Sequence, residues 1–251
     1  MKASTMRELL VQAEETWGEE IVIRYKSGKG TVAEKSYTDL RKDSEHFSDL
    51  LEALKVRGGH VALIGPTSYE WILSYFGTVN SGSVAVPLDA SLPAADVCEL
   101  VDRADAVVLV ADEARKDVLE AARIQCPKLR YLISMQKTED GDGILALPKL
   151  MEMTLEEMEP GTGARADLQP DQLASILFTS GTTGKSKGFM LTHRNLAENA
   201  TCLDMKFPER SVLLSVLPVH HAYCLSMDIL KGISSGSVIC INDSLFRMAA
   251  N

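Results

Sequence analysis

The stretch Ile176-Leu-Phe-Thr-Ser-Gly-Thr-Thr-Gly-Lys-Ser-Lys-Gly-Phe-Met-Leu-Thr-His193 runs from one apolar strand, through a loop rich in glycine and hydroxyl groups, into a second apolar strand. Its glycines let the backbone turn sharply and approach a ligand closely. Successive backbone N–H groups in such a turn form a concave anion site. Side-chain donors and positive charge come from Thr179, Ser180, Thr182, Thr183, Lys185 and Lys187. This composition suits a nucleoside triphosphate better than a plain surface turn.

The Walker P-loop is the nearest competing motif, because Gly184-Lys185-Ser186 copies its last three letters. That motif needs a glycine five residues before Gly184, where this chain has Thr179. It also needs a helix that begins at the lysine and points its N-terminus at the phosphates. Here Gly188 follows at once, residues 189–191 are predicted to be a strand, and the helical pattern starts only at residue 192. The sequence therefore excludes a Walker site.

From Thr179 to His193 the chain resembles the signature of the AMP-forming adenylating enzymes, which include acyl-CoA synthetases, peptide-synthetase adenylation domains and luciferases. The family pattern is Thr/Ser-Ser/Thr-Gly-Thr-Thr-Gly-x-Pro-Lys-Gly, and Ser186 stands where proline is commonest. The resemblance implies that this segment, residues 179–187, holds the β- and γ-phosphates of ATP; we call it the phosphate loop. The implied binding residues are Thr179, Ser180, Gly181, Thr182, Thr183, Gly184 and Lys187, which takes the position of the family's loop lysine.

Three further segments resemble motifs of the same family and extend the resemblance over residues 20–245. Residues 36–40 are similar to its opening motif, and residues 80–89, which end in Pro-Leu-Asp89, to its second motif. Residues 217–223, Leu-Pro-Val-His-His-Ala-Tyr, are similar to its fourth motif, Leu-Pro-x-Phe-His. This alignment implies that His221 lies beside the acyl pocket, and it places His220 where the family has an aromatic residue. Taken alone, a histidine at a strand end is more commonly a hydrogen-bonded structural residue. We interpret His193 and His220 as structural or solvated residues, and Asp89 as a structural turn residue at the end of its strand.

Apolar runs alternate with helical patterns along the chain. Candidate strands are residues 60–64, 84–88, 106–110, 131–134, 173–179, 188–191, 211–217 and 237–242, and candidate helices lie near 68–80, 93–103, 113–125, 192–204 and 222–234. Short apolar strands separated by helices are typical of βαβ units and of a parallel sheet covered on both faces. We therefore expect an α/β fold of layered βαβ units with mostly parallel sheets, plus a hairpin-like antiparallel edge at residues 21–32. Trp71 and Tyr75, one helical turn apart, are predicted core residues.

The organisation predicted from the resemblance is that of the N-terminal part of the large domain of the acyl-adenylate-forming fold. A loop at residues 159–170 divides the chain into a first α/β subdomain, residues 1–170, and the start of a second, residues 171–251, which carries the phosphate loop. Family members are roughly twice as long as this chain. The family's later motifs for adenine, ribose and magnesium do not occur here, nor does the small C-terminal lid domain with the catalytic lysine. We therefore expect an N-terminal fragment.

Composition limits the class of protein. Hydrophobic residues make up 45% of the chain and charged residues 24%, as in a globular protein, and the net charge of −9 argues against a nucleic-acid partner. We expect neither a transmembrane segment nor a signal peptide, and a cytoplasmic location. The five cysteines are scattered without paired spacing, so reduced thiols are expected and a metal site is not.

The resemblance implies a reaction in which a carboxylate attacks the α-phosphorus of ATP, with magnesium (Mg2+), to give an acyl-adenylate and pyrophosphate. The acyl group then passes to coenzyme A (CoA). The context of residues 213–223 resembles fatty acyl-CoA ligases, so a fatty acid is the expected substrate and the isolated chain is expected to be inactive. Three alternatives stay open: an amino-acid or aryl-acid adenylating enzyme, for which Asp228 is a candidate reader; a non-catalytic nucleotide-binding module; and a phosphotransferase.

Overall fold

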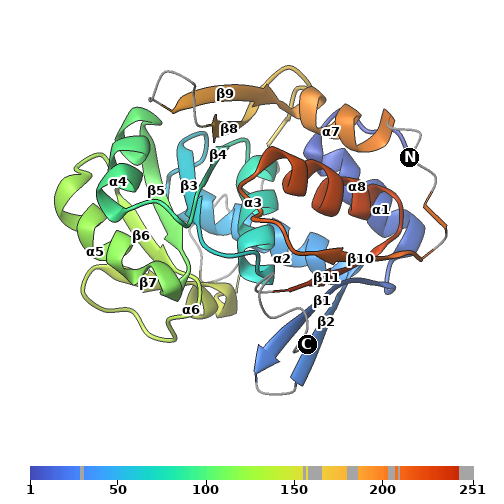
Figure 1. The fold of residues 1–251 in the computed structure, drawn as a ribbon, viewed down its shortest axis with the longest axis horizontal. Helices are drawn as coiled ribbons and strands as arrows, with labels where there is room; N and C mark the ends of the chain where they lie inside the picture. Colours follow the sequence, from blue (N-terminus) through green and yellow to red (C-terminus); the bar gives the residue numbers. More distant parts are fainter. Residues whose placement is uncertain are drawn as a thin grey trace.

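The computed structural model describes residues 1–28, 31–154, 157, 166–179, 186–202, 207–208 and 210–242. Two sheets organise these residues, a seven-stranded sheet in the order β7-β6-β5-β3-β4-β8-β9 and a four-stranded sheet in the order β10-β11-β1-β2. Helices lie between the two sheets and also cover the outer face of the larger one (Figure 1). This arrangement confirms the predicted layered α/β fold.

The seven-stranded sheet is parallel except for its last pair of strands. It consists of β3 (His60–Ile64), β4 (Val84–Leu88), β5 (Ala106–Ala111), β6 (Tyr131–Ser134), β7 (Ile144–Ala146), β8 (Leu173–Thr179) and β9 (Lys187–Thr192). Strands β8 and β9 form the antiparallel pair. The central strands are almost wholly buried because helices cover both of their faces, which is why they read as continuous apolar runs. The predicted strands are confirmed, except that β7 is too short to give a periodic signal and was missed.

Two apolar cores flank this sheet. On one face α4 (Ala94–Arg103) and α5 (Lys116–Gln125), which follows the short 3-10 helix Glu113–Arg115, pack against the strands. On the other face lie α1 (Met6–Trp17), α2 (Tyr37–Ala53) and α3 (Tyr69–Asn80). The rings of Trp71 and Tyr75 in α3 are fully buried and stack with centroids 5.5 Å apart. Their predicted place in the core is confirmed.

The four-stranded sheet joins the two ends of the sequence. Strands β1 (Ile21–Gly28) and β2 (Thr31–Ser36) form the expected antiparallel hairpin, with β2 at the edge. On its other side β1 pairs in parallel with β11 (Val238–Ile241), and β11 pairs with β10 (Val212–Ser215). The hairpin was predicted, but its parallel partner more than 200 residues away was not.

The helices of the C-terminal third agree with prediction in position but not always in type. α7 (His193–Cys202) starts where expected. The predicted helix near 222–234 is a π-helix at Cys224–Leu230 that continues as α8 (Lys231–Ser234). π-Helical segments are rare in proteins, and those that occur often lie at functional sites. The short helix α6 (Leu147–Glu152) was missed.

Strands from both sides of residue 170 share both sheets. β8 pairs with β4 in the larger sheet, and β11 pairs with β1 in the smaller one. Ser175 fixes the first junction, because its buried hydroxyl donates to the carbonyl of Ala85 at 3.0 Å. The division into subdomains 1–170 and 171–251 stays a prediction.

Candidate functional site

The phosphate loop connects β8 to β9. In this antiparallel pair the last register partners are Thr179 and Lys187, so these two residues form the base of the loop. The side chains of Thr179 and Lys187 are both exposed. Residues 180–185 lie outside the described part of the chain. The predicted phosphate ligands among them, Ser180, Gly181, Thr182, Thr183 and Gly184, therefore keep their roles as predictions.

An arginine that the sequence analysis did not single out lies at the base of this loop. Arg103 ends α4, and its Nη2 donates a hydrogen bond to the carbonyl of Ser186 at 2.8 Å. Its guanidinium also lies over the Phe178 ring, 5.7 Å from the centroid. Nothing in the local pattern around Arg103 marks it, because 83 residues separate it from Ser186.

The second predicted motif ends at the edge of the sheet where the phosphate loop begins. β4 and β8 are parallel, with Ala85 opposite Ser175, and Asp89 and Thr179 come four residues later on the two strands. Carboxyl ends of parallel strands meet at one edge, where open α/β sheets bind their ligands. Arg115 stabilises the loop after β4, because its Nη1 donates a hydrogen bond to the carbonyl of Ala90 at 2.6 Å.

The fourth motif reaches this edge from the other sheet. Thr67, just after β3, donates a hydrogen bond to the carbonyl of Leu217 at 3.3 Å. The Nε2 of His220 lies 3.6 Å from Oδ1 of Asp89, so the second and fourth motifs touch. Sequence analysis interpreted both residues as structural and did not pair them.

The environments of these two groups shift their proton affinities. Burial lowers the pKa of His220, although the charge of Asp89 opposes the change. Burial alone would raise the pKa of Asp89, but hydrogen bonds from the N–H and hydroxyl of Ser91, with His220 and Arg115 nearby, lower it overall. The edge therefore carries an ionised carboxylate beside a neutral imidazole at pH 7.

His221, the predicted pocket residue, is exposed. Its Nδ1 accepts a hydrogen bond from the N–H of Tyr223 at 3.3 Å, and its own N–H donates to the carbonyl of Pro218 at 3.0 Å. These bonds form a tight turn at the end of the fourth motif. The role of His221 toward a substrate stays a prediction.

Asp228 lies inside the π-helix that follows this turn. Its Oδ2 accepts from the hydroxyl of Ser215 at 3.1 Å and lies 3.6 Å from the Sγ of Cys224. Burial raises the pKa of the Cys224 thiol to about 12, so this sulfur is a neutral donor. The carboxylate of Asp228 is thus engaged within the protein, between the π-helix and β10.

A small apolar cavity adjoins the same helix. It has a volume of about 190 Å³ and lies between the β8–β9 pair, α7 and the π-helix. Its lining is mostly leucine, and the full set is Leu177, Leu191, Asn195, Leu196, Asn199, Ala222, Leu225, Ser226 and Leu230. Ala222 directly follows His221, so the cavity begins next to the predicted pocket residue.

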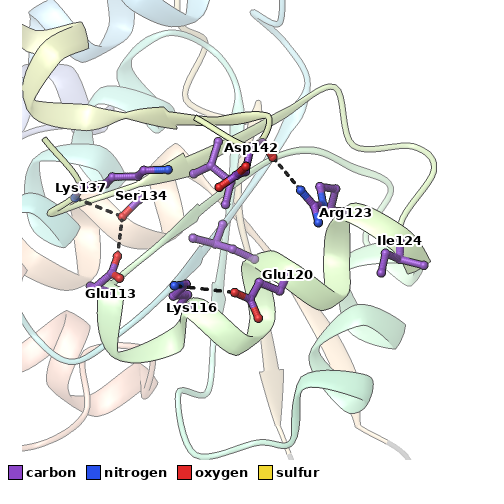
Figure 2. Close-up of a pocket in the computed structure, with 10 residues that line it drawn as sticks. Glu113, Lys116, Glu120, Arg123, Ile124, Ser134, Lys137 and Asp142 are labelled. Atoms are coloured by element: carbon purple, nitrogen blue, oxygen red, sulfur yellow. Dashed lines mark hydrogen bonds and ion pairs between the residues drawn. The ribbon is translucent and has the colours of Figure 1, made fainter. Parts of the chain in front are cut away.

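A wider hollow of about 550 Å³ lies elsewhere, against α5 and the ends of β6 and β7 (Figure 2). Its charged side chains have partners within the protein. Lys116 pairs with Glu120, Arg123 donates to the carbonyl of Asp142, and the Ser134 hydroxyl donates to Glu113 (Figure 2). Basic and acidic groups are balanced, and none of the predicted site residues lines this hollow, so we do not assign the activity to it.

Two absences hold for the residues that the structure describes. No cluster of three or more His, Cys, Asp or Glu side chains could hold a metal ion there. Within the same residues, no helix is long and apolar enough to cross a membrane.

The sequence is similar to those of curated CoA ligases. Curated relatives include 4-coumarate-CoA ligase 1 of Narcissus pseudonarcissus, 29% identical over 216 residues, which cover 82% of this chain and 38% of the relative. A crotonobetaine/carnitine–CoA ligase of Escherichia coli is 27% identical over 243 residues, covering 94% of this chain and 46% of the relative. This chain thus spans less than half the length of these relatives.

Solved structures share the fold. The inhibitor-bound N-terminal domain of FACL13 from Mycobacterium tuberculosis has a TM-score of 0.79 at 22% identity, over 98% of this chain and 58% of that one. The anthranilate CoA ligase AuaEII in complex with anthranoyl-AMP has a TM-score of 0.86 at 19% identity, over 98% of this chain and 46% of that one. The family model of the AMP-binding enzymes matches residues 10–250, which confirms the predicted resemblance, and the chain belongs to the AMP-binding enzyme family.

Proposed function

We propose that this chain is the nucleotide-binding part of an ATP-dependent, AMP-forming carboxylic acid–CoA ligase. The observation that carries the proposal is the meeting of three motifs at one edge of the sheet. The phosphate loop closes at Thr179 and Lys187, and the second and fourth motifs touch through Asp89 and His220 beside it. Membership of the AMP-binding family and relatives that are CoA ligases support the same reaction class.

The proposed chemistry follows from charge. A carboxylate and a triphosphate repel each other, so an enzyme that joins them must position both and offset their charge. In our proposal the backbone N–H groups and hydroxyls of residues 179–184, with Lys187, bind the β- and γ-phosphates that leave as pyrophosphate. His221 lies beside the acid. The described residues offer no cluster for magnesium, so Mg2+ enters only as the proposed companion of ATP, and we assign it no ligand in this chain.

The structure favours an apolar acid over an amino acid. A reader of a substrate amino group needs a carboxylate that faces the ligand, but Asp228 is engaged by Ser215 and Cys224. The cavity beside His221 is lined mainly by leucine, which suits an aliphatic or aromatic acyl group. We therefore propose a fatty acid as substrate, with an aryl acid as the alternative, and CoA as the acceptor.

Several parts of this proposal concern the whole protein. The chain covers 38% and 46% of the two ligases named above, so overall activity, the CoA step and a cytoplasmic location are proposals. We therefore propose that this chain binds ATP but does not turn it over alone.

Acid-dependent release of pyrophosphate tests the function. ATP, magnesium and a panel of fatty, aryl and amino acids are supplied to this chain and to the longest protein that contains it. We expect release by the longer protein only, strongest with an apolar acid, and a loss of ATP binding in Lys187→Ala of either protein. ADP as the product would indicate a phosphotransferase. Binding of ATP by both proteins without release by either would indicate the non-catalytic module instead.

A further inference from the structure

Arg103 connects two segments that flank the phosphate loop. Phe178 is the residue before Thr179 on β8, and Ser186 is the residue before Lys187 on β9. The guanidinium of Arg103 lies over the Phe178 ring and donates to the Ser186 carbonyl at 2.8 Å. A single side chain from α4 therefore contacts both sides of the loop base.

The space for this contact depends on a glycine. Phe178 and Gly188 are register partners in the β8–β9 pair. A Cβ atom at position 188 would come within 3.1 Å of Ile176 Cγ2 and 3.3 Å of Phe178 Cε1, which is tighter than ordinary contact. Any side chain at position 188 would displace the Phe178 ring, which is the ring over which the Arg103 guanidinium lies.

The charge of Arg103 is only weakly neutralised by its neighbours. Arg103 forms an ion pair with Glu99, one turn earlier in α4, at 3.7 Å between Nη1 and Oε1. The Glu99 side chain is 66% exposed, and exposed pairs of this kind contribute little. A guanidinium has five N–H donors in a rigid plane, and planar donors suit phosphate oxygens. Arg103 thus adds positive charge beside Ser186 and the start of β9, where Lys187 closes the loop base.

We propose that Arg103 is a positioning residue for the nucleotide triphosphate: it fixes the base of the phosphate loop through Ser186 and adds positive charge at its side. The inference rests on the proposed function, because the loop is taken to bind ATP. It goes beyond the family motif, which contains no residue of α4.

The chain offers a closely matched control. Arg130 also lies over an aromatic ring, 5.8 Å from the centroid of Tyr131, and its Nη1 donates to a backbone carbonyl, that of Lys55, at 2.8 Å. Arg130 makes the same two contacts as Arg103 but between other segments. Arg103→Ala and Arg130→Ala therefore both remove a ring contact and a hydrogen bond to a backbone carbonyl, and only the first removes them at the phosphate loop. Arg103→Ala also removes the exposed ion pair with Glu99, which contributes little.

The first measurement is binding of Mg-ATP and of inorganic pyrophosphate to this chain by calorimetry, at two salt concentrations. We expect Arg103→Ala to weaken both affinities about tenfold, as for loss of a hydrogen-bonded charge. Arg103→Lys keeps the charge but lacks the rigid planar set of donors, so it should recover only part of the loss. Arg130→Ala should bind as wild type, and the salt dependence should fall in Arg103→Ala alone. Equal affinities in Arg103→Ala and wild type would overturn the proposal.

A second measurement does not depend on nucleotide binding. Amide hydrogen exchange at residues 186–189 should become several-fold faster in Arg103→Ala and in Gly188→Ala, but not in Arg130→Ala. Unchanged exchange in Arg103→Ala would overturn the positioning role even if ATP binds. If the wild-type chain binds neither ligand, the proposed function is wrong, and exchange still decides whether Arg103 holds the loop base.

Discussion

His193 should make the stability of this protein fall in mild acid. The side chain is fully buried at the start of α7, and its Nδ1 accepts a hydrogen bond from the N–H of Met6 at 3.3 Å. Burial, with a smaller contribution from the charge of Arg7, lowers the pKa of His193 from 6.5 to about 4. The imidazole thus ties α7 to the N-terminal helix in its neutral form.

The direction of the effect follows from which state binds the proton. Above pH 6.5 His193 is neutral in both states, and its contribution is constant. Below that pH the unfolded chain takes up a proton while the folded protein does not until about pH 4. Each pH unit in this window lowers the free energy of unfolding by about 1.4 kcal/mol, so the full loss is about 3 kcal/mol. That is a large part of the stability of an ordinary domain.

Urea unfolding followed by circular dichroism, from pH 7.5 to pH 4.5, measures this contribution. The comparison is with His193→Asn, which keeps an acceptor for the Met6 N–H but does not titrate in this range. The variant should be less stable at pH 7.5 because it packs less well, and its deficit should shrink by about 2 kcal/mol or more at pH 4.5. Leu196→Ala, also buried on α7, serves as control: it should cost about 2–5 kcal/mol at every pH.

A constant difference between wild type and His193→Asn across the pH range would refute the reasoning. It would mean that the folded protein protonates His193 as readily as the unfolded chain does. NMR gives an independent check, because the ring signal of His193 should not titrate above about pH 5.

Three further changes have definite expected outcomes. Gly236→Ala should destabilise the protein by about 1–3 kcal/mol and alter tryptophan fluorescence, because φ is +73° there and a Cβ would lie 2.5 Å from Cε2 of Trp17. Asp89→Asn should lower the pKa of His220 further in an NMR titration, since the lost charge is the one that opposes burial; a higher pKa would contradict the pairing. Ser36→Ala should cost about 1 kcal/mol in urea unfolding, because the residue closes a capping box at the start of α2, and no change would exclude that role.

Local patterns in the sequence were enough to predict most elements. β3, β4, β6 and β8 have the predicted bounds, because buried parallel strands are short apolar runs flanked by turn residues. The phosphate loop motif predicted both the family and the loop's place between two strands, which the β8–β9 pair confirms. Elements with weak local signals were missed, namely β7, with only three residues, and the short helix α6 that follows it.

The contacts that assemble the candidate site were not predictable in this way. Asp89 meets His220 only because the fourth motif packs against the end of β4, and Arg103 reaches Ser186 only because the end of α4 lies beside the β8–β9 pair. Separations of 131 and 83 residues leave no periodic trace in the sequence between such partners. His220 and Asp89 were therefore interpreted separately, and Arg103 was not noticed at all.

The sequence by itself determined the α/β class, the positions of most strands along the chain and the family to which the chain belongs. These depend on hydrophobic periodicity and on residue types within a few positions of one another. Only the tertiary structure decided that β1 pairs with β11 and β8 with β4, and which side chains surround the loop. Strand order in a sheet is set by how whole layers bury their apolar faces, and that free energy depends on the entire packed chain rather than on any one segment.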